Sequence, residues 1–416
     1  MTPTIAAVLA AAFVWLLLPM KVNPTRDSWQ SKEYWLCQAL FGLAGIGFLV
    51  GIIDAANPAI SILRFWLPAA VGVGVAALNL FHDPQIRPSG LFLLGVFVPM
   101  AAFAISERLT MPLMSLALLL PAILVPRSGY ALDTLYTGLR DAVRLMLLIL
   151  LGFIAIFPNV IIGPCRSDKC SVWGQALGPL GAGNAFGVYV AFICGISVLL
   201  AKNAQSTVLV VLASGVLVDA TSSRSALLSW GLTVTAALVW RLVRSQKQIP
   251  LLTGLSISTL ALIAFFALYS WRPQDFTGRA NLWIVAKESF LGQPLFGLGP
   301  SFWVRQDRTS YVDSNYATHN LLLEVLVSVG LFGAIAMFAS VVCLIGGSDK
   351  SLRGVTLVLT TAWLAGSVLE VSAAPGRMYL LPGVLVLLYV LGQSNGVRIE
   401  NQQSNVTSYS KKTSYF

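Results

Sequence analysis

The sequence predicts an all-α polytopic membrane protein, and its composition leads to this fold class. Of its 416 residues, 56% are hydrophobic and 11% are charged, against roughly 25% charged residues in an average soluble domain. The mean hydropathy is +0.78. A soluble fold could not bury this much apolar surface, because large soluble chains divide into domains instead of enlarging one core. The values exclude a soluble enzyme, a disordered chain and a secreted disulfide scaffold.

The predicted membrane helices are apolar runs that end at charged residues, prolines or glycine-rich breaks, and each span needs about 20 residues. The runs lie near 4–20, 35–53, 63–81, 90–105, 109–125, 142–163, 183–200, 206–220, 224–243, 250–270, 319–346, 355–371 and 378–392. The runs at 90–105 and 109–125 are short and closely spaced, so a re-entrant segment is an alternative there. We expect about 12–13 transmembrane helices in one domain over 1–392, with one long external loop at 271–318.

The two ends of the chain are predicted separately. The first run has no basic segment before it, and its positive charges follow it, which favours a retained helix over a signal peptide. Residues 393–416 are rich in Ser, Asn, Gln and Lys, which predicts a disordered cytoplasmic tail.

Basic residues predict the orientation of the chain. The net charge is +10, from 27 Lys and Arg against 17 Asp and Glu. In a soluble protein this excess would suggest nucleic acid, but in a membrane protein Lys and Arg of short loops gather on the cytoplasmic side. If the 21–34 loop is cytoplasmic, sixteen basic residues lie on its side and eleven on the other, five of them in the 271–318 loop. We therefore expect the 271–318 loop outside.

Two cysteines, Cys165 and Cys170, lie in a predicted external loop. An outward compartment permits disulfides, and a separation of five residues can be bridged in a turn. A disulfide and two free thiols both stay open. Zinc is disfavoured because no histidine is near in the sequence.

The first half of the long loop predicts a short amphipathic helix on the membrane surface. It begins near Arg279, Thr277 is a candidate N-cap, and a glycine turn at 294–299 ends it. Its apolar positions recur at helical spacing: Leu282, Trp283, Ala286 and Phe290.

Two arginines are predicted at helix starts on the external side, Arg279 and Arg224, the second after the hydroxyl residues 221–223. Arginine is locally unfavourable there, because a helix N-terminus carries partial positive charge. A bound anion would receive backbone N–H groups, the helix dipole and a guanidinium fork, which suits phosphate oxygens. The alternative is that both are ordinary loop or snorkelling arginines.

His319 opens the span after the long loop. The helix dipole disfavours an imidazolium there, and a neutral imidazole is what a general base requires. Glu324 is an ionisable group inside the same apolar run, which favours a functional role. Structural roles are the alternative for both. Asp219 and Glu370, the other ionisable groups near apolar runs, form no evident relay. Two arginines and a base together suggest a lipid-linked phosphate donor and a hydroxyl acceptor, and an anion transporter is the alternative that would also explain the arginines.

An ordered set of residues resembles the signature of the O-antigen ligase and O-antigen polymerase superfamily. The set is Gly278-Arg279, Trp283, Pro294-x-x-Gly297-x-Gly299, His319-Asn320 and Gly330-x-x-Gly333, with Arg224-x-x-x-Leu228 and Asn184 upstream. The resemblance in residue pattern covers about 220–335. Before residue 220 it is limited to the overall arrangement of predicted membrane helices. The sequence departs from it at Ala334, where ligases often carry Thr or Tyr, so ligase, polymerase and exopolysaccharide polymerase all stay open.

The resemblance implies a metal-independent, inverting glycosyltransferase with a GT-C-like helical bundle and no cofactor. Its donor would be a glycan on undecaprenyl diphosphate, at the periplasmic face of the bacterial inner membrane. Arg224 and Arg279 would hold the diphosphate, and His319 would activate the acceptor hydroxyl of a lipopolysaccharide core sugar or of another lipid-linked repeat. Further candidate substrate-binding residues are Gly278, Trp283, Asn320, Glu324 and Arg377. The alternative from another class is a transporter, either a flippase or a small-anion transporter, but the sequence shows no internal repeat.

Overall fold

The computed structural model describes residues 3–18, 34–36, 58–81, 84–108, 113, 116–117, 119–126, 132–165, 170–172, 174–177, 183–300, 302, 318–371 and 388–392. These ranges are mostly helical, which confirms the all-α prediction in its coarse form. The expected runs at 35–53 and 378–392 lie largely outside the described residues.

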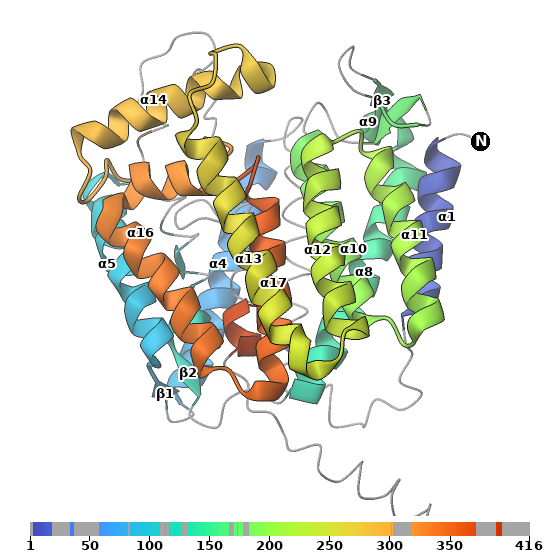
Figure 1. Ribbon diagram of the computed structural model, residues 1–416, viewed down its shortest axis with the longest axis horizontal. Helices are drawn as coiled ribbons and strands as arrows, with labels where there is room; N and C mark the ends of the chain where they lie inside the picture. Colours follow the sequence, from blue (N-terminus) through green and yellow to red (C-terminus); the bar gives the residue numbers. More distant parts are fainter. Residues whose placement is uncertain are drawn as a thin grey trace, which may run out of the picture.

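The helices of the described part form one bundle (Figure 1). They are α1 (Pro3–Leu17), α4 (Pro58–Leu80), α5 (Pro88–Ser106), α7 (Leu120–Ile123), α8 (Leu132–Ile156), α9 (Pro158–Ile161), α10 (Gly183–Leu200), α11 (Ala204–Ala220), α12 (Arg224–Leu242), α13 (Ser245–Leu268), α14 (Arg279–Gly292), α16 (Leu321–Gly347) and α17 (Lys350–Gly366). A 3-10 turn, η4 (Asp275–Gly278), precedes α14. Two short antiparallel pairs complete it, β1 (Pro84–Gln85) with β2 (Val125–Pro126), and β3 (Ile162–Pro164) with β4 (Gln175–Leu177).

Four helices in the described part are long and apolar enough to cross a membrane: α5, α12, α13 and α16. Shorter apolar helices lie over Ile5–Leu17, Ala69–Leu80, Phe186–Leu200, Ala204–Ala220 and Leu352–Gly366. Large apolar side chains also point outward, such as Ile257 on α13 and Ile335 on α16, which are 62% and 57% exposed. Lipid accepts such side chains at no cost, so the pattern is that of a membrane protein.

The expected span at 109–125 is different in the structure. Its described residues contain only the four-residue helix α7 and the start of β2. Pro121 lies in the first turn of α7, where a missing N–H is tolerated, and β2 then pairs with β1. The described part of this run is therefore too short to span by itself.

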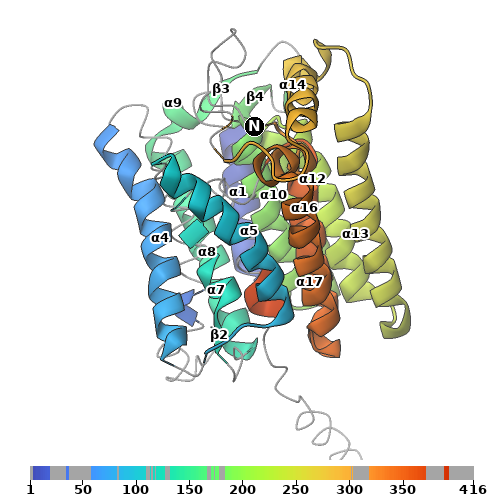
Figure 2. The same cartoon turned by 90° about the vertical axis from the view of Figure 1, so that its left-hand side faces the viewer.

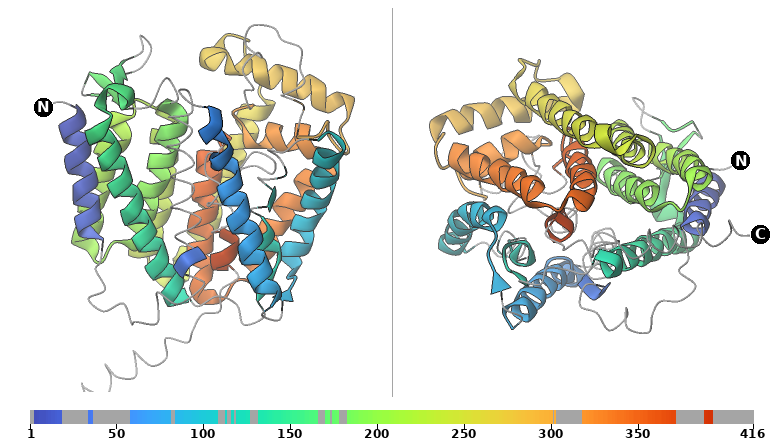
Figure 3. Two further views of the ribbon diagram at one scale, coloured as in Figure 1. Left: turned by 180° about the vertical axis from the view of Figure 1, so that it is seen from behind. Right: turned by 60° about the horizontal axis from the view of Figure 1, so that its bottom comes forward.

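One end of the bundle gathers the elements that the sequence predicts on one side of the membrane. The helix α14 lies across this end, next to the start of α16, and the β3 hairpin and the start of α1 lie at the same end (Figures 1 and 2). The β1–β2 pair and the turn from α16 to α17 lie at the opposite end (Figure 1), and two further views of the bundle are given in Figure 3. We call the first the α14 end. The ends of α11 and α13 both reach it, so the starts of α12 and α14 lie there too.

Glycines let α10 and α12 approach closely. A Cβ on Gly187 would lie 2.7 Å from the Cβ of Ala226, and one on Gly195 would lie 2.2 Å from Cγ2 of Thr233. Small residues bring helices together in membranes, where packing has to replace the hydrophobic effect. This contact fixes the start of α12, and with it Arg224, against α10.

The glycine turn after α14 docks into a break in α16. At Gly330 the helix is interrupted, with φ +66° and ψ −167°, which leaves backbone groups without intrahelical partners. The N–H groups of Leu298 and Gly299 donate to the carbonyls of Val327 and Ser328, and the N–H groups of Leu331 and Phe332 donate to the carbonyls of 294 and 295. The turn and the break therefore satisfy each other, and they fix α14 relative to α16.

Replacing Gly330 with alanine is expected to destabilise the protein by at least about 2 kcal/mol, because this backbone conformation is nearly exclusive to glycine. A Cβ there would also lie 2.3 Å from the carbonyl oxygen of Leu295. Thermal unfolding of the detergent-solubilised protein measures the loss. Gly254→Ala on α13 is the matched control, because no described atom lies within 4 Å of its Cβ position. Equal melting temperatures for the two variants would contradict the docking of the turn.

Candidate active site

Arg224 is the first residue of α12, and its helix start is built as the sequence predicts. Ser223 is the N-cap, and its Oγ accepts from the N–H of Ala226 at 3.3 Å. The same hydroxyl lies 3.2 Å from Oδ1 of Asn184 and 3.0 Å from Oγ of Ser225. Arg224 itself is exposed, whereas Ser223 is fully buried. The cap is anchored in the bundle, and the guanidinium-bearing residue faces outward from it.

Arg279 is the first residue of α14, but Thr277 is not its N-cap. The N-cap is Gly278 with φ +84°, and no side chain caps the helix. Thr277 has φ +61°, and an N-cap residue normally has extended backbone, so its hydroxyl is not placed to cap. The prediction of the cap was wrong, while the predicted start of the helix is confirmed. Of the expected apolar positions, Leu282, Trp283 and Ala286 are buried and Phe290 is half-buried.

The guanidinium of Arg279 is held by the segment that follows α17. Its Nη1 donates to the carbonyl of Leu369 at 2.7 Å, and its Nη2 lies 2.5 Å from Oε1 of Glu370. The side chain of Arg279 is 16% exposed, and that of Glu370 is 3% exposed. These two contacts use two of the five guanidinium N–H groups. One side of the Arg279 guanidinium is therefore fixed by the bundle, and its charge lies close to the surface of the protein.

His319 is brought to the same carboxylate. Its Nδ1 lies 2.6 Å from Oε2 of Glu370, and its side chain is 15% exposed. The residue directly precedes Asn320, the N-cap of α16, so His319 lies just outside the helix that was expected to include it. Its φ is +56°, a backbone conformation that is uncommon outside glycine and clusters at functional sites.

Glu370 is the residue that the sequence interpretation missed. We expected no relay from it, but its two oxygens join Arg279 and His319. Burial raises the pKa of the Glu370 carboxyl, but the charge that His319 carries when protonated, the charge of Arg279 and the hydrogen bonds from both outweigh it, so this pKa lies below the ordinary value. The ion pair with Arg279, which keeps its charge at all physiological pH values, favours the ionised form of Glu370. Its place at the end of an apolar run was the available signal.

Asn320 locks the segment around His319. Its Oδ1 accepts from the N–H of Leu323 at 3.2 Å, which caps α16. Its Nδ2 donates to the carbonyl of Ile263 at 3.0 Å and to that of Val368 at 3.3 Å. One buried side chain thus joins α13, the start of α16 and the segment that carries Glu370.

The backbone on the other side of His319, at Thr318, is fixed by Trp283 and Glu324. The indole Nε1 of Trp283 donates to the carbonyl of Thr318 at 2.7 Å. The N–H and hydroxyl of Thr318 lie 3.2 and 3.1 Å from Oε2 of Glu324. Trp283 is 0% exposed and Glu324 is 2% exposed. We therefore interpret Trp283, Asn320 and Glu324 as supports of the site instead of the substrate contacts that the sequence suggested.

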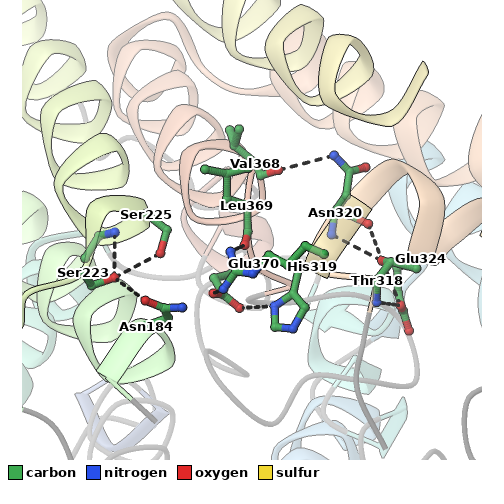
Figure 4. A network of polar contacts seen from close by, with 12 residues as sticks. Asn184, Ser223, Ser225, Thr318, His319, Asn320, Glu324, Val368, Leu369 and Glu370 are labelled. Atoms are coloured by element: carbon green, nitrogen blue, oxygen red, sulfur yellow. Dashed lines mark hydrogen bonds and ion pairs between the residues drawn. The ribbon is translucent and has the colours of Figure 1, made fainter. Parts of the chain in front are cut away.

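Figure 4 shows how these groups lie relative to one another. Glu370 and His319 lie between the Ser223 group, with Asn184 and Ser225, and the group of Thr318 and Glu324. Ser223 and Ser225 flank Arg224 in the sequence, and α12 packs along α17, which leads to Glu370. The helix start that carries Arg224 therefore lies across from the Arg279, Glu370 and His319 cluster, at the α14 end.

Residues 208–338 match the O-antigen ligase family. No curated protein matches the chain. The matched segment runs from α11 into α16 past the break at Gly330, and it confirms the resemblance to the O-antigen ligase and polymerase superfamily. The match supports a role in membrane glycan ligation or polymerisation. Together, the apolar helices and the match indicate a bacterial membrane protein.

The O-antigen ligase segment includes Arg224, Arg279 and His319 but not Glu370, which lies beyond its end. The carboxylate that joins two of these residues thus comes from beyond the matched segment. Gly278, a further candidate of the ligase pattern, serves as the left-handed N-cap that lets α14 begin at Arg279. Arg377 and most of the loop after Phe302 lie outside the described residues.

The remaining candidate of the sequence analysis is the pair of cysteines. The structure joins Cys165 and Cys170 by a disulfide, with 4.9 Å between their Cα atoms. Nearby, the N–H of Val172 donates to Oδ2 of Asp219 at the end of α11. The disulfide therefore closes a hairpin loop beside α11.

Proposed function

We propose that this protein transfers a glycan from a lipid-linked diphosphate donor to an acceptor hydroxyl, in the ligation or polymerisation of a cell-surface polysaccharide. The observation that carries the proposal is the bridge of Glu370 between Arg279 and His319. It brings a guanidinium group and an imidazole into one cluster at the α14 end of an apolar bundle. The match of 208–338 to the O-antigen ligase family supports it.

The arginines are suited to the donor. As the glycosidic bond to the diphosphate breaks, negative charge develops on the leaving oxygens. Arg279 and Arg224 would stabilise this charge with hydrogen bonds from guanidinium groups, and the starts of α12 and α14 add partial positive charge. Arg377 would add a third cation. These groups would supply the charge stabilisation without a metal ion.

The imidazole is suited to the acceptor. With Nδ1 directed at Glu370, the other ring nitrogen, Nε2, would be the one that meets the acceptor in the substrate complex. It would take the proton of the acceptor hydroxyl while this oxygen attacks the anomeric carbon. Attack from the side opposite the diphosphate gives inversion. We further propose undecaprenyl diphosphate as the carrier, a GT-C-like bundle as the scaffold, and the periplasmic face of the inner membrane as the location of the α14 end.

The test is alanine substitution of Arg279 or His319, followed by analysis of lipid-linked glycans in the cells. We expect unprocessed donor to accumulate and the surface glycan to be short or unattached. Arg272→Ala is the control, because this exposed arginine lies in the same loop and its described contact to Asp275 comes from its backbone N–H. Normal glycan together with altered flux of another solute would support a transporter instead.

The glycan product that is lost in these variants distinguishes a ligase from a polymerase. A ligase and a polymerase need the same donor chemistry, so the site does not distinguish them. Loss of chain length in the variants indicates a polymerase, and loss of attachment at normal length indicates a ligase.

A further inference from the structure

We propose that Glu370 is a positioning residue that sets the tautomer of His319 and orients Arg279, so that one carboxylate prepares both halves of the transfer. The inference rests on the proposed function and deepens it. The residue does not touch the reacting atoms; it acts through its two partners. Each partner contacts a different oxygen of the Glu370 carboxylate. Oε1 lies 2.5 Å from Nη2 of Arg279, and Oε2 lies 2.6 Å from Nδ1 of His319.

The tautomer follows from the chemistry of the contact. An ionised carboxylate can only accept hydrogen bonds, so the ring nitrogen that faces it must carry the hydrogen. Nδ1 therefore donates to Glu370. In a neutral imidazole the lone pair then lies on Nε2. Without the carboxylate, either nitrogen could carry the hydrogen, and only one of the two tautomers can take a proton at Nε2.

The same contact stabilises the charge that the reaction creates. The acceptor oxygen forms a bond to the anomeric carbon as its proton passes to Nε2 of His319. The bond from that carbon to the diphosphate oxygen breaks, and the diphosphate leaves with the electron pair. The resulting imidazolium has the Glu370 carboxylate at Nδ1, and the diphosphate has the arginines. A carboxylate in this position stabilises an imidazolium without taking its proton.

Arg279 is oriented by the same segment. Its guanidinium binds Oε1 of Glu370 and the carbonyl of Leu369 at once, which fixes the plane of the fork. The other three of its five N–H groups are not used by these two contacts. A fork that is already fixed loses little conformational entropy when it binds a phosphate.

Glu370 can act in this way because its own position is fixed to the start of α16. The N–H of Leu321 donates to the carbonyl of Ser367 at 3.2 Å, and Nδ2 of Asn320 donates to the carbonyl of Val368 at 3.3 Å. These bonds hold the segment that ends in Glu370 directly beside His319. The carboxylate itself is only 3% exposed, so water does not compete for it.

The first test reads the tautomer directly. The chain has two histidines, His82 and His319, so an H82Q variant labelled with [15N]histidine leaves one imidazole to observe. Ring nitrogens with and without hydrogen have well separated NMR shifts. In the full-length protein in nanodiscs we expect hydrogen on Nδ1. Hydrogen on Nε2 of the neutral ring would overturn the proposal, and this result needs no change at Glu370.

The second test is Glu370→Gln with kinetics of the reconstituted protein. The amide keeps the shape and an acceptor for Arg279, but its NH2 group faces Nδ1 and favours hydrogen on Nε2. We expect kcat to fall by about 10³-fold or more, as for wrong-tautomer variants of catalytic histidines. The donor KM should change less than about tenfold, and the NMR signal should move to the other tautomer. Glu288→Gln, at an exposed carboxylate on α14, is the matched control and keeps wild-type kinetics.

The outcomes separate this inference from the proposed function. Near-normal kcat in Glu370→Gln, with inactive His319→Ala and Arg279→Ala, would overturn the positioning role and leave the proposed function standing. A parallel loss of kcat, rise of KM and fall of melting temperature, with an unchanged tautomer, would show a merely structural carboxylate. Absence of transfer in the wild-type protein would contradict the proposed function, while the NMR result would still test the tautomer.

Discussion

Replacing His319 with asparagine is expected to lower kcat by about 10² to 10⁴-fold, the range that removal of a general base spans. Asparagine is chosen because His319 has φ +56°, and asparagine is among the side chains that tolerate this backbone conformation. It can still donate a hydrogen bond to Glu370, but it offers no nitrogen that accepts a proton. The variant therefore removes the base and leaves the backbone of the loop in place. Single-turnover kinetics with a lipid-linked diphosphate donor measures the effect.

We expect the His319→Asn variant to differ from the wild type in kcat alone. The donor KM should change little, since the diphosphate is assigned to the arginines, and the melting temperature should stay near that of the wild type. His319→Ala is the informative comparison, because it removes the base and also places alanine at a positive φ. A His319→Asn protein that keeps more than about a tenth of the wild-type kcat would show that His319 is not the base.

Replacing Arg279 with lysine is expected to lower kcat/KM for the donor by about 10²-fold, although the charge is retained. Arg279 donates to Leu369 and Glu370 from two nitrogens of one plane, at 2.7 and 2.5 Å. A lysine ammonium is a single point charge. If it binds the Glu370 carboxylate, it has no second, fixed set of N–H donors left for the phosphate. Loss of an oriented donor should affect kcat as well as KM, because the hydrogen bonds strengthen as the diphosphate leaves.

Arg272→Lys is the matched control, since this exposed arginine lies seven positions earlier at the same end of the bundle. The measurement is the initial rate of release of the lipid diphosphate at varied donor concentration. If Arg279→Lys has wild-type kcat/KM, charge alone suffices, and the fork geometry has no part in the transfer.

Local patterns of the sequence predicted the elements that depend on neighbours in the chain. The helix that begins at Arg279 follows from apolar residues at helical spacing, and the Ser223 cap follows from the preference of helix starts for hydroxyl side chains. The apolar runs predicted membrane helices because a spanning segment must satisfy its backbone internally. The cap of α14 was missed because a glycine in a left-handed conformation replaced the expected threonine.

Long-range contacts decided the site. Glu370 is 91 positions from Arg279 and 51 from His319 in the chain, so no local spacing indicates that they meet. Trp283 was predicted on the apolar face of its helix, but only the structure shows that it also holds the carbonyl next to His319.

By itself, then, the sequence determined that this is a polytopic membrane protein with Arg224, Arg279 and His319 at the starts of helices, because apolar composition and helix-start chemistry are local. Only the tertiary structure decided which carboxylate serves them and how the glycine turn completes the broken helix at Gly330. The physical reason is the same in both cases. A buried charge and an interrupted helix must find partners for hydrogen bonding, and the packing of the bundle brings those partners from distant parts of the chain.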